Sequence, residues 1–267
     1  MDIKQKKNLK YALCISGGIR SFPRSIFIES IEVLLNEIPN LDIFIVLKMT
    51  DKHKNFLNSS EGSNSIVRNF LYLKPKKIIF IDTFFDKKIN VSSYSSQLLL
   101  IDKSINLACQ HGKYDFFIRY RPDFILLNLN LNFNNLNENI IYTTRKKDAK
   151  ASDQVFMFSN KLREKWWSKL NFFLTEKRCP EYEIFNDLPD EVILQNGPCF
   201  YGGLLRIRDN KLCFWDDFSK LKYQDKYKLE ITRDKNFQNK FKDMLIKLLD
   251  SHNLDFLYIN QLVLNNS

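Results

Sequence analysis

Two arginines and one aspartate follow an apolar segment at every second position. Residues 116–118 (FFI) are strand formers, and Arg119, Arg121 and Asp123 come directly after them. Side chains two residues apart in an extended chain point to the same side of it, and Pro122 favours an extended conformation at Arg121. The sequence therefore predicts that two guanidinium groups and one carboxylate project together beyond a buried strand, where open α/β sheets bind ligands.

This cluster is suited to a phosphorylated ligand. Arginine binds phosphate oxygens in bidentate fashion, and a carboxylate at a strand end can hold a divalent ion that bridges a diphosphate. We expect Arg119, Arg121 and Asp123 to hold a nucleotide diphosphate, with Asp123 as the candidate ligand for Mn²⁺ or Mg²⁺. One carboxylate is a poor metal site by itself, so a metal-free site is the alternative. The alternative without any bound ligand is that these three residues form an ordinary ion-pair cluster at the protein surface.

The segment SGGIR at positions 16–20 follows the predicted strand 11–15. Its glycines let the backbone approach a ligand, and the following helix presents N–H groups and the positive end of its dipole to phosphate. The spacing matches neither a P-loop nor the GxGxxG fingerprint. We expect Ser16, Gly17, Gly18 and Arg20 to contact a nucleotide, and an ordinary tight turn is the alternative.

Two further acids are catalytic candidates. Asp153 lies in the segment ASDQV, directly before an apolar strand, where its carboxylate could orient a hydroxyl or act as its base. The alternative is an Asx turn that starts the strand. Glu191 begins the segment EVIL, which we interpret as a possible helical turn. Acids at a helix start are favoured for structural reasons alone, so a catalytic Glu191 requires that it face the same crevice.

Strands and helices alternate along the chain. This order predicts an α/β fold with a mostly parallel sheet and helices on both faces. Residues 127–139 are Asn-rich and predict a surface connection, and Gly202 with Gly203 predicts a bulge or a close approach of two backbones. We expect a flexible basic leader at 1–9 and a single domain at 10–267. The predicted strands are 11–15, 43–47, 78–81, 116–118, 140–143, 155–158 and 256–259, and the predicted helices are 24–38, 66–73, 96–111, 162–173 and 237–248.

Composition and charge make several classes of protein less favoured for this chain. The chain has 267 residues, 44% of them hydrophobic, which is enough for a large core. Its net charge of +10 is spread along the sequence and no RNP, zinc-finger or helix-turn-helix signature accompanies it, so a nucleic-acid-binding protein is only an alternative. The five cysteines form no CxxC pair and suit buried thiols in a reducing compartment. No apolar run is long enough for a membrane span, and we expect a cytoplasmic protein.

Four segments together resemble a known family. They are CISGGIRSF at 14–22, YDFFIRYRPDF at 114–124, SDQVF at 152–156 and EVIL at 191–194. This pattern is similar to GT-A-type glycosyltransferases, in particular uncharacterised viral, algal and bacterial members, over residues 11–205. The resemblance implies a GT-A-like (Rossmann-like) fold whose first loop contacts the nucleotide. Asp123 would take the place of an acid of the DXD motif. Arg121 replaces that motif's first acid, which allows a metal-independent variant.

The same resemblance implies an activity. The enzyme would move a hexosyl or pentosyl group from a nucleotide-diphosphate sugar to a hydroxyl of a glycan or glycoprotein acceptor. Asp153 and Glu191 would face the acceptor or the transferred sugar, and Asp153 would be the base of an inverting reaction. A viral member would work in the host cytoplasm or the virion. The segment 16–20 also resembles the SGGxDS loop of PP-loop pyrophosphatases, with Arg20 in the aspartate position, so a nucleotide-binding enzyme of that kind is the alternative.

Overall fold

The computed structural model describes twelve segments of the chain. The predictions for residues 1–7, Arg20, the helix at 237–248 and the strand at 256–259 lie outside them. The described residues are 8–18, 25–38, 40–48, 68–81, 93–144, 152–170, 184–185, 188–195, 199–208, 211–216, 220–224 and 228–230.

A mostly parallel sheet forms the centre of the protein, in the order β3-β2-β1-β4-β7-β6-β8. The strands β3, β2, β1 and β4 are parallel to one another, β7 is antiparallel to both β4 and β6, and β8 is parallel to β6. Their bounds are β1 Tyr11–Gly18, β2 Leu41–Lys48, β3 Lys77–Ile81, β4 Phe116–Tyr120, β6 Ile140–Thr143, β7 Val155–Ser159 and β8 Ile193–Leu194.

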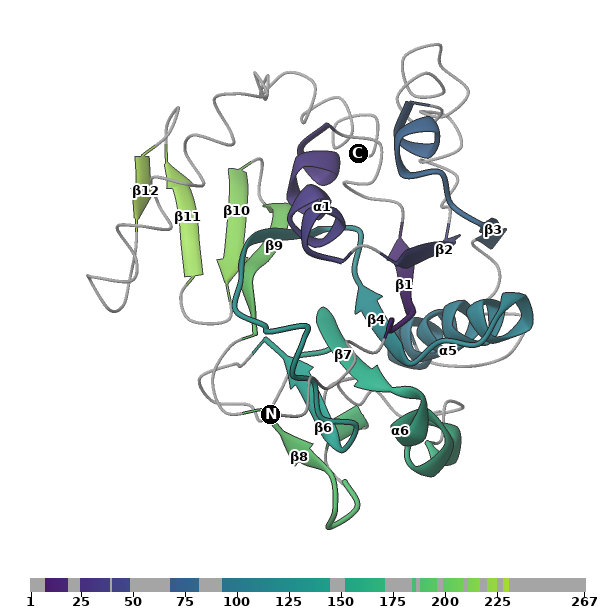
Figure 1. Ribbon diagram of the computed structural model, residues 1–267. Helices are drawn as coiled ribbons and strands as arrows, with labels where there is room; N and C mark the ends of the chain where they lie inside the picture. The colour runs from purple at the N-terminus through teal and green to yellow at the C-terminus, as the bar shows by residue number, and fades with distance from the viewer. Residues whose placement is uncertain are drawn as a thin grey trace.

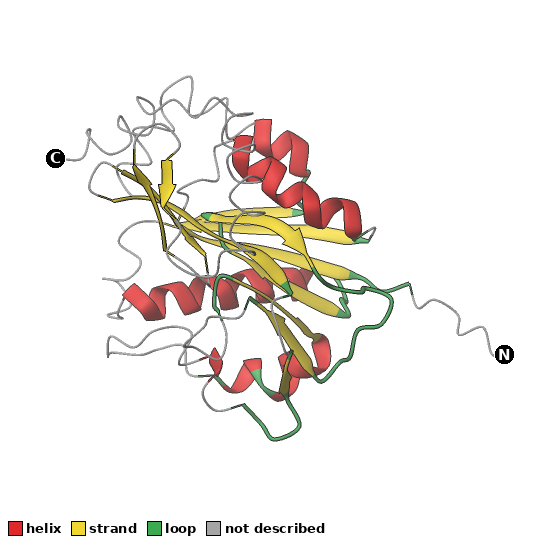
Figure 2. Ribbon diagram, turned by 90° about the vertical axis from the view of Figure 1, so that its left-hand side faces the viewer, coloured by secondary structure: helices red, strands yellow, loops and turns green. Residues whose placement is uncertain are grey.

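Two helices cover opposite faces of this sheet (Figure 2). In β1, Leu13 and Ile15 join the core on the side of α1 (Ser25–Glu37), whereas Ala12 and Cys14 join the core on the side of α5 (Ser93–His111). Strands buried on both faces are continuous apolar runs, as β1 and β2 are. The predicted α/β fold with helices on both faces is therefore confirmed.

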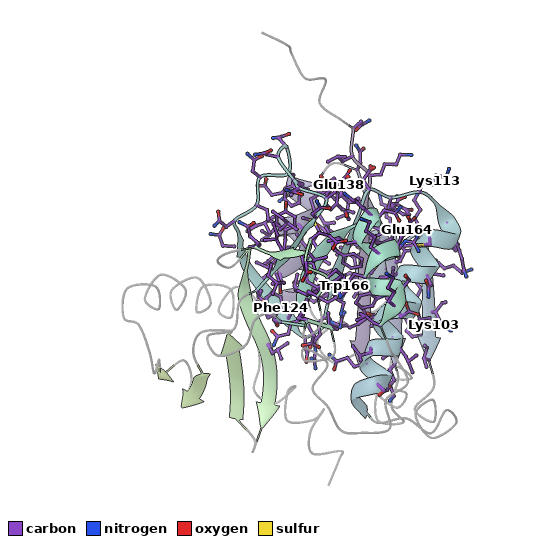
Figure 3. All side chains as sticks on the ribbon, turned by 90° about the horizontal axis from the view of Figure 1, so that it is seen from below. Lys103, Lys113, Phe124, Glu138, Glu164 and Trp166 are labelled. Carbon is purple, nitrogen blue, oxygen red and sulfur yellow. The ribbon has the colours of Figure 1, made fainter. Side chains whose placement is uncertain are left out.

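A second, antiparallel sheet lies beside α1 (Figure 1). Its order is β12-β11-β10-β9-β5. Phe124, the first residue of β5, lies at the boundary between this second sheet and the main sheet (Figure 3). The prediction of a surface connection at 127–139 was therefore wrong for its first residues, because pairing with β9 extends the chain there. The bounds are β5 Phe124–Leu129, β9 Phe200–Arg208, β10 Lys211–Asp216, β11 Lys220–Gln224 and β12 Lys228–Glu230.

The pairing of β5 with β9 depends on Gly202. A Cβ atom at this position would lie 2.0 Å from the carbonyl oxygen of Ile125 and 2.8 Å from the ring of Phe124. The register of the pair also shifts between Leu126 and Asn128. The close approach of two backbones that the two glycines predicted is thus confirmed at Gly202.

The helix predicted at 162–173 is shorter than expected in the described residues. It consists of α6 (Asn160–Lys165) and a 3₁₀ turn at Trp167–Lys169. Trp166 and Trp167 are both buried, and both rings pack against Phe158. The burial of two adjacent indoles explains the break, since neighbouring residues of a regular helix do not share one face. Among the described helices, none has the length and apolar character needed to cross a membrane.

Candidate active site

The chain turns sharply at the carboxyl end of β4. The backbone N–H of Arg121 donates to the carbonyl of Gln154 at 3.0 Å, and that of Phe124 donates back to the carbonyl of Arg121 at 3.0 Å. Asp123 therefore lies in a tight turn between the two sheets, and not in the extended chain that the alternating spacing predicted. The turn prevails because pairing of β5 with β9 requires the chain to leave the main sheet here.

The turn nevertheless brings the predicted side chains together around Arg121. Its Nε lies 2.7 Å from Oδ1 of Asp123, and its Nη1 lies 3.8 Å from Oδ2 of Asp153. The side chains of Asp123 and Asp153 are 0% and 2% exposed, and that of Arg121 is 11% exposed. One guanidinium thus lies between two buried carboxylates, which is an arrangement that satisfies charge away from water.

Asp153 reaches this cluster because β7 is antiparallel to β4. Val155 pairs with Tyr120, so the residues before β7 lie at the same edge of the sheet as the residues after β4. The first turns of α5 lie there too, and Gln97 donates a hydrogen bond from Nε2 to Oδ2 of Asp153. The sequence analysis missed Gln97. Its position near the start of a helix that follows a parallel strand was the only signal for it.

Arg119 is completely buried between β1 and β4. Its Nη1 donates to the carbonyl oxygens of Ser16, at 2.6 Å, and of Tyr120. Its Nε and Nη2 and the Oγ of Ser16 have no hydrogen-bond partner in the described part of the chain. Burial lowers the pKa of Arg119 to about 9, and the nearby carboxylates of Asp153 and Asp123 oppose this shift. The guanidinium is therefore cationic at neutral pH.

The first loop touches the turn after β4. Gly17 has φ +137°, a conformation that favours glycine, and a Cβ there would lie 3.2 Å from Cδ of Pro122 and 4.0 Å from Nη2 of Arg119. Ser16, Gly17 and Gly18 end β1 next to the arginine cluster. The structure thus brings this predicted nucleotide loop and the predicted diphosphate residues to one place. Arg20 lies outside the described residues.

A buried hydroxyl network holds the turn from the side of α1. The hydroxyl of Tyr120 donates to the carbonyl of Phe124 at 3.1 Å and lies 2.8 Å from Oγ of Ser30. Ser30 also accepts a hydrogen bond from the N–H of Leu126 at 2.6 Å. Since Tyr120 donates to Phe124, the Ser30 hydroxyl donates to Tyr120. Burial raises the pKa of Tyr120, so its hydroxyl stays protonated and able to donate.

Glu191 does not join the cluster. It lies in a turn before β8, is exposed, and faces Lys165 at 3.6 Å. Ile193 of β8 pairs with Ile140, whereas the partner of Phe156 near Asp153 is Thr143, at the other end of β6. The helical turn predicted at 191–194 was wrong, because Ile193–Leu194 pairs as a strand. A catalytic role for Glu191 stays a prediction to which this geometry gives no support.

A metal held by protein side chains alone does not fit the cluster. Within the described segments, no group of three or more His, Cys, Asp or Glu side chains could hold a metal ion. The two carboxylates present, those of Asp123 and Asp153, are both in contact with Arg121.

This protein is similar to known proteins in structure, but no similarity is found in sequence. Neither protein-family profiles nor curated protein sequences match the chain. The apo-form glycosyltransferase GlyE of Streptococcus pneumoniae TIGR4 aligns at 17% identity and a TM-score of 0.36, covering 70% of this chain and 45% of its own. This chain therefore spans less than half of that enzyme. The inositol-1-phosphate CTP transferase of T. maritima aligns at 11% identity and a TM-score of 0.41, covering 91% and 98%.

A third alignment is with the nucleoside-diphosphate-sugar pyrophosphorylase of Vibrio cholerae RC9, at 8% identity and a TM-score of 0.34, covering 60% of this chain and 77% of the other. Because all three TM-scores are below 0.5, none of these likenesses carries an argument about this chain's activity.

Proposed function

We propose that this chain is a glycosyltransferase that moves a sugar from a nucleotide-diphosphate sugar to a hydroxyl of a glycan or glycoprotein. The observation that supports this most directly is the guanidinium of Arg121 between two buried carboxylates. It lies at the carboxyl edge of the parallel strands, where sheets of this type bind ligands. The motif resemblance of the same residues adds to this support.

The arginines suit the leaving group of such a reaction. Arg121 is the least buried member of the cluster, and the buried Arg119 keeps two guanidinium nitrogens, Nε and Nη2, without a hydrogen-bond partner in the described residues. Guanidinium groups that face a diphosphate stabilise the negative charge that develops on it as the bond to the sugar breaks. The glycines at 17 and 18 let the backbone of the first loop lie close to the nucleotide, with Ser16 Oγ able to bond to it.

Asp153 is suited to act as the general base of this reaction. Gln97 and Arg121 both contact its carboxylate and favour its charged form. In the proposed reaction, Asp153 takes the proton of the acceptor hydroxyl, and the hydroxyl oxygen forms a bond to the anomeric carbon of the sugar. The bond between that carbon and the diphosphate oxygen breaks, and its electron pair leaves with the nucleoside diphosphate. One displacement of this kind inverts the anomeric configuration.

A thermal-shift panel of UDP, GDP, ADP and CMP sugars, with ATP as a comparison, tests the proposal. A donor at 100 times its Kd is expected to stabilise the protein by ~2.7 kcal/mol. Selective stabilisation by one class of sugar nucleotide, followed by release of its nucleoside diphosphate when acceptor glycans are added, is the expected result. Stabilisation by ATP alone, or by no sugar nucleotide, would overturn it.

Changing Gln97 to alanine is expected to shift the pH dependence of transfer. The carboxylate of Asp153 loses a hydrogen-bond donor that favours its charged form, so the acid limb of the kcat/KM profile moves to higher pH. The measurement is the pH–rate profile of the two proteins with the donor found in the panel. Gln110, exposed near the far end of α5, provides the control, and Gln110→Ala should leave the profile in place. An unchanged acid limb in Gln97→Ala would show that this contact does not tune the base.

A further inference from the structure

The contacts of Arg121 bear on whether the site needs a divalent ion. Its Nε and Nη1 face one oxygen of Asp123 and one oxygen of Asp153, the two carboxylates that a divalent ion would need. An ion at either carboxylate would have to displace the guanidinium or approach it as a like charge. Both are unfavourable for groups as buried as these.

The charges of the whole cluster also disfavour a divalent ion at this site. Arg119 and Arg121 carry two positive charges, Asp123 and Asp153 carry two negative charges, and each of the other three groups acts on the pKa of Arg119. A divalent ion would add two positive charges beside two arginines. A diphosphate, by contrast, is an anion that both arginines can attract.

We propose, on the basis of the proposed function, that Arg121 is the fixed cation of this site and that the donor's diphosphate binds without a divalent ion. In this view Asp123 is a positioning residue, because its carboxylate contacts Nε and fixes the orientation in which the guanidinium meets the phosphate oxygens. The ligand class is a nucleoside diphosphate group recognised by guanidinium in place of a metal.

Inorganic pyrophosphate is the probe, since it carries the diphosphate without base or sugar. Thermal stability of the wild-type chain is measured with an excess of pyrophosphate, once in EDTA and once in Mn²⁺. We expect the same upward shift of Tm in both. A shift seen only with Mn²⁺, or no shift in either, would overturn the proposal. This comparison needs no variant to fold.

A second measurement removes the guanidinium. Mn²⁺ binding, followed by the EPR signal of the free ion, is compared between the wild type, Arg121→Gln and the matched control Arg163→Gln. Arg163 lies on α6 at the other edge of the sheet, where it contacts Glu164. The loss of Arg121 leaves two buried carboxylates without their shared cation, so the affinity for Mn²⁺ is expected to rise at least about tenfold in that variant alone. Binding of Mn²⁺ by the wild type that equals or exceeds that of Arg121→Gln would contradict the inference.

These outcomes are separate from those of the donor panel. A sugar nucleotide that binds only with Mn²⁺ overturns the metal-free site and leaves the transferase. If no sugar nucleotide of the panel binds but pyrophosphate binds in EDTA, the transferase proposal is overturned and the proposal of a metal-free diphosphate site stands.

Discussion

Asp153→Asn is expected to lower the rate of sugar transfer by roughly 10²–10⁴-fold, the usual contribution of a general base. The amide has the shape of the carboxylate and can still accept the hydrogen bond from Gln97, but it cannot take the proton of the acceptor. Because Arg121 keeps its contact with Asp123, donor binding should fall much less than turnover. Single-turnover rates and donor-induced Tm shifts, measured on the same protein, separate the two effects.

Asp115→Asn is the matched control for this change. Asp115 lies just before β4, at the opposite end of that strand from the cluster, and its carboxylate accepts a hydrogen bond from the N–H of Lys10 at 2.8 Å. The asparagine can accept the same bond, so stability and rate should both stay close to the wild type. A folded Asp153→Asn protein with the rate of the control would remove Asp153 from the mechanism.

Gly202→Ala is expected to cost about 3 kcal/mol or more of unfolding free energy, which for a chain of this size lowers Tm by about 6–12 °C. The new Cβ would meet the carbonyl oxygen of Ile125 at 2.0 Å and its carbonyl carbon at 2.9 Å. These are backbone atoms of the paired strand, so they can give way only if β5 and β9 separate. Thermal and denaturant unfolding of the variant measure the effect.

Gly112→Ala shows what the same substitution costs where the neighbour can move. The atoms nearest to its new Cβ belong to the side chain of Tyr114, at 3.1 and 3.3 Å, and a small rotation of the ring relieves the contact. We expect a change within about 1 kcal/mol, as for ordinary substitutions away from rigid backbone. Equal losses of stability in the two variants would show that β5 and β9 are not held as closely as described.

The strands of the parallel half were predictable because burial on both faces leaves a direct mark on the sequence. The runs at 11–15 and 43–47 are uninterrupted apolar segments, and the helices between strands follow from their apolar stripes. The association of Arg119, Arg121 and Asp123 was also predicted. The prediction that an extended chain would bring them together was wrong, because Asp123 meets Arg121 through a tight turn.

The other features depend on contacts between distant parts of the chain. The short apolar run FILL at 124–127 does not by itself distinguish a strand from the start of a connection, and β5 is defined by its pairing with β9. Gln97 becomes part of the site only when α5 packs on β1 and β2 and β7 pairs antiparallel with β4. Local sequence likewise gave no sign that Arg119 would be fully enclosed while Arg121 stays partly open.

The antiparallel pairing of β7 with β4 has a consequence for the nascent chain. On the ribosome, β1 to β4 are complete before β7 has been made, and the residues from Arg121 to Gln154 take on the order of seconds to synthesise. During that interval the edge of β4 that β7 later covers has no partner strand, and open edges recruit other chains. Arg119, the one charged residue of this otherwise apolar strand, would discourage such pairing. An arginine buried in the cluster of the finished protein would then also protect the chain before that cluster exists.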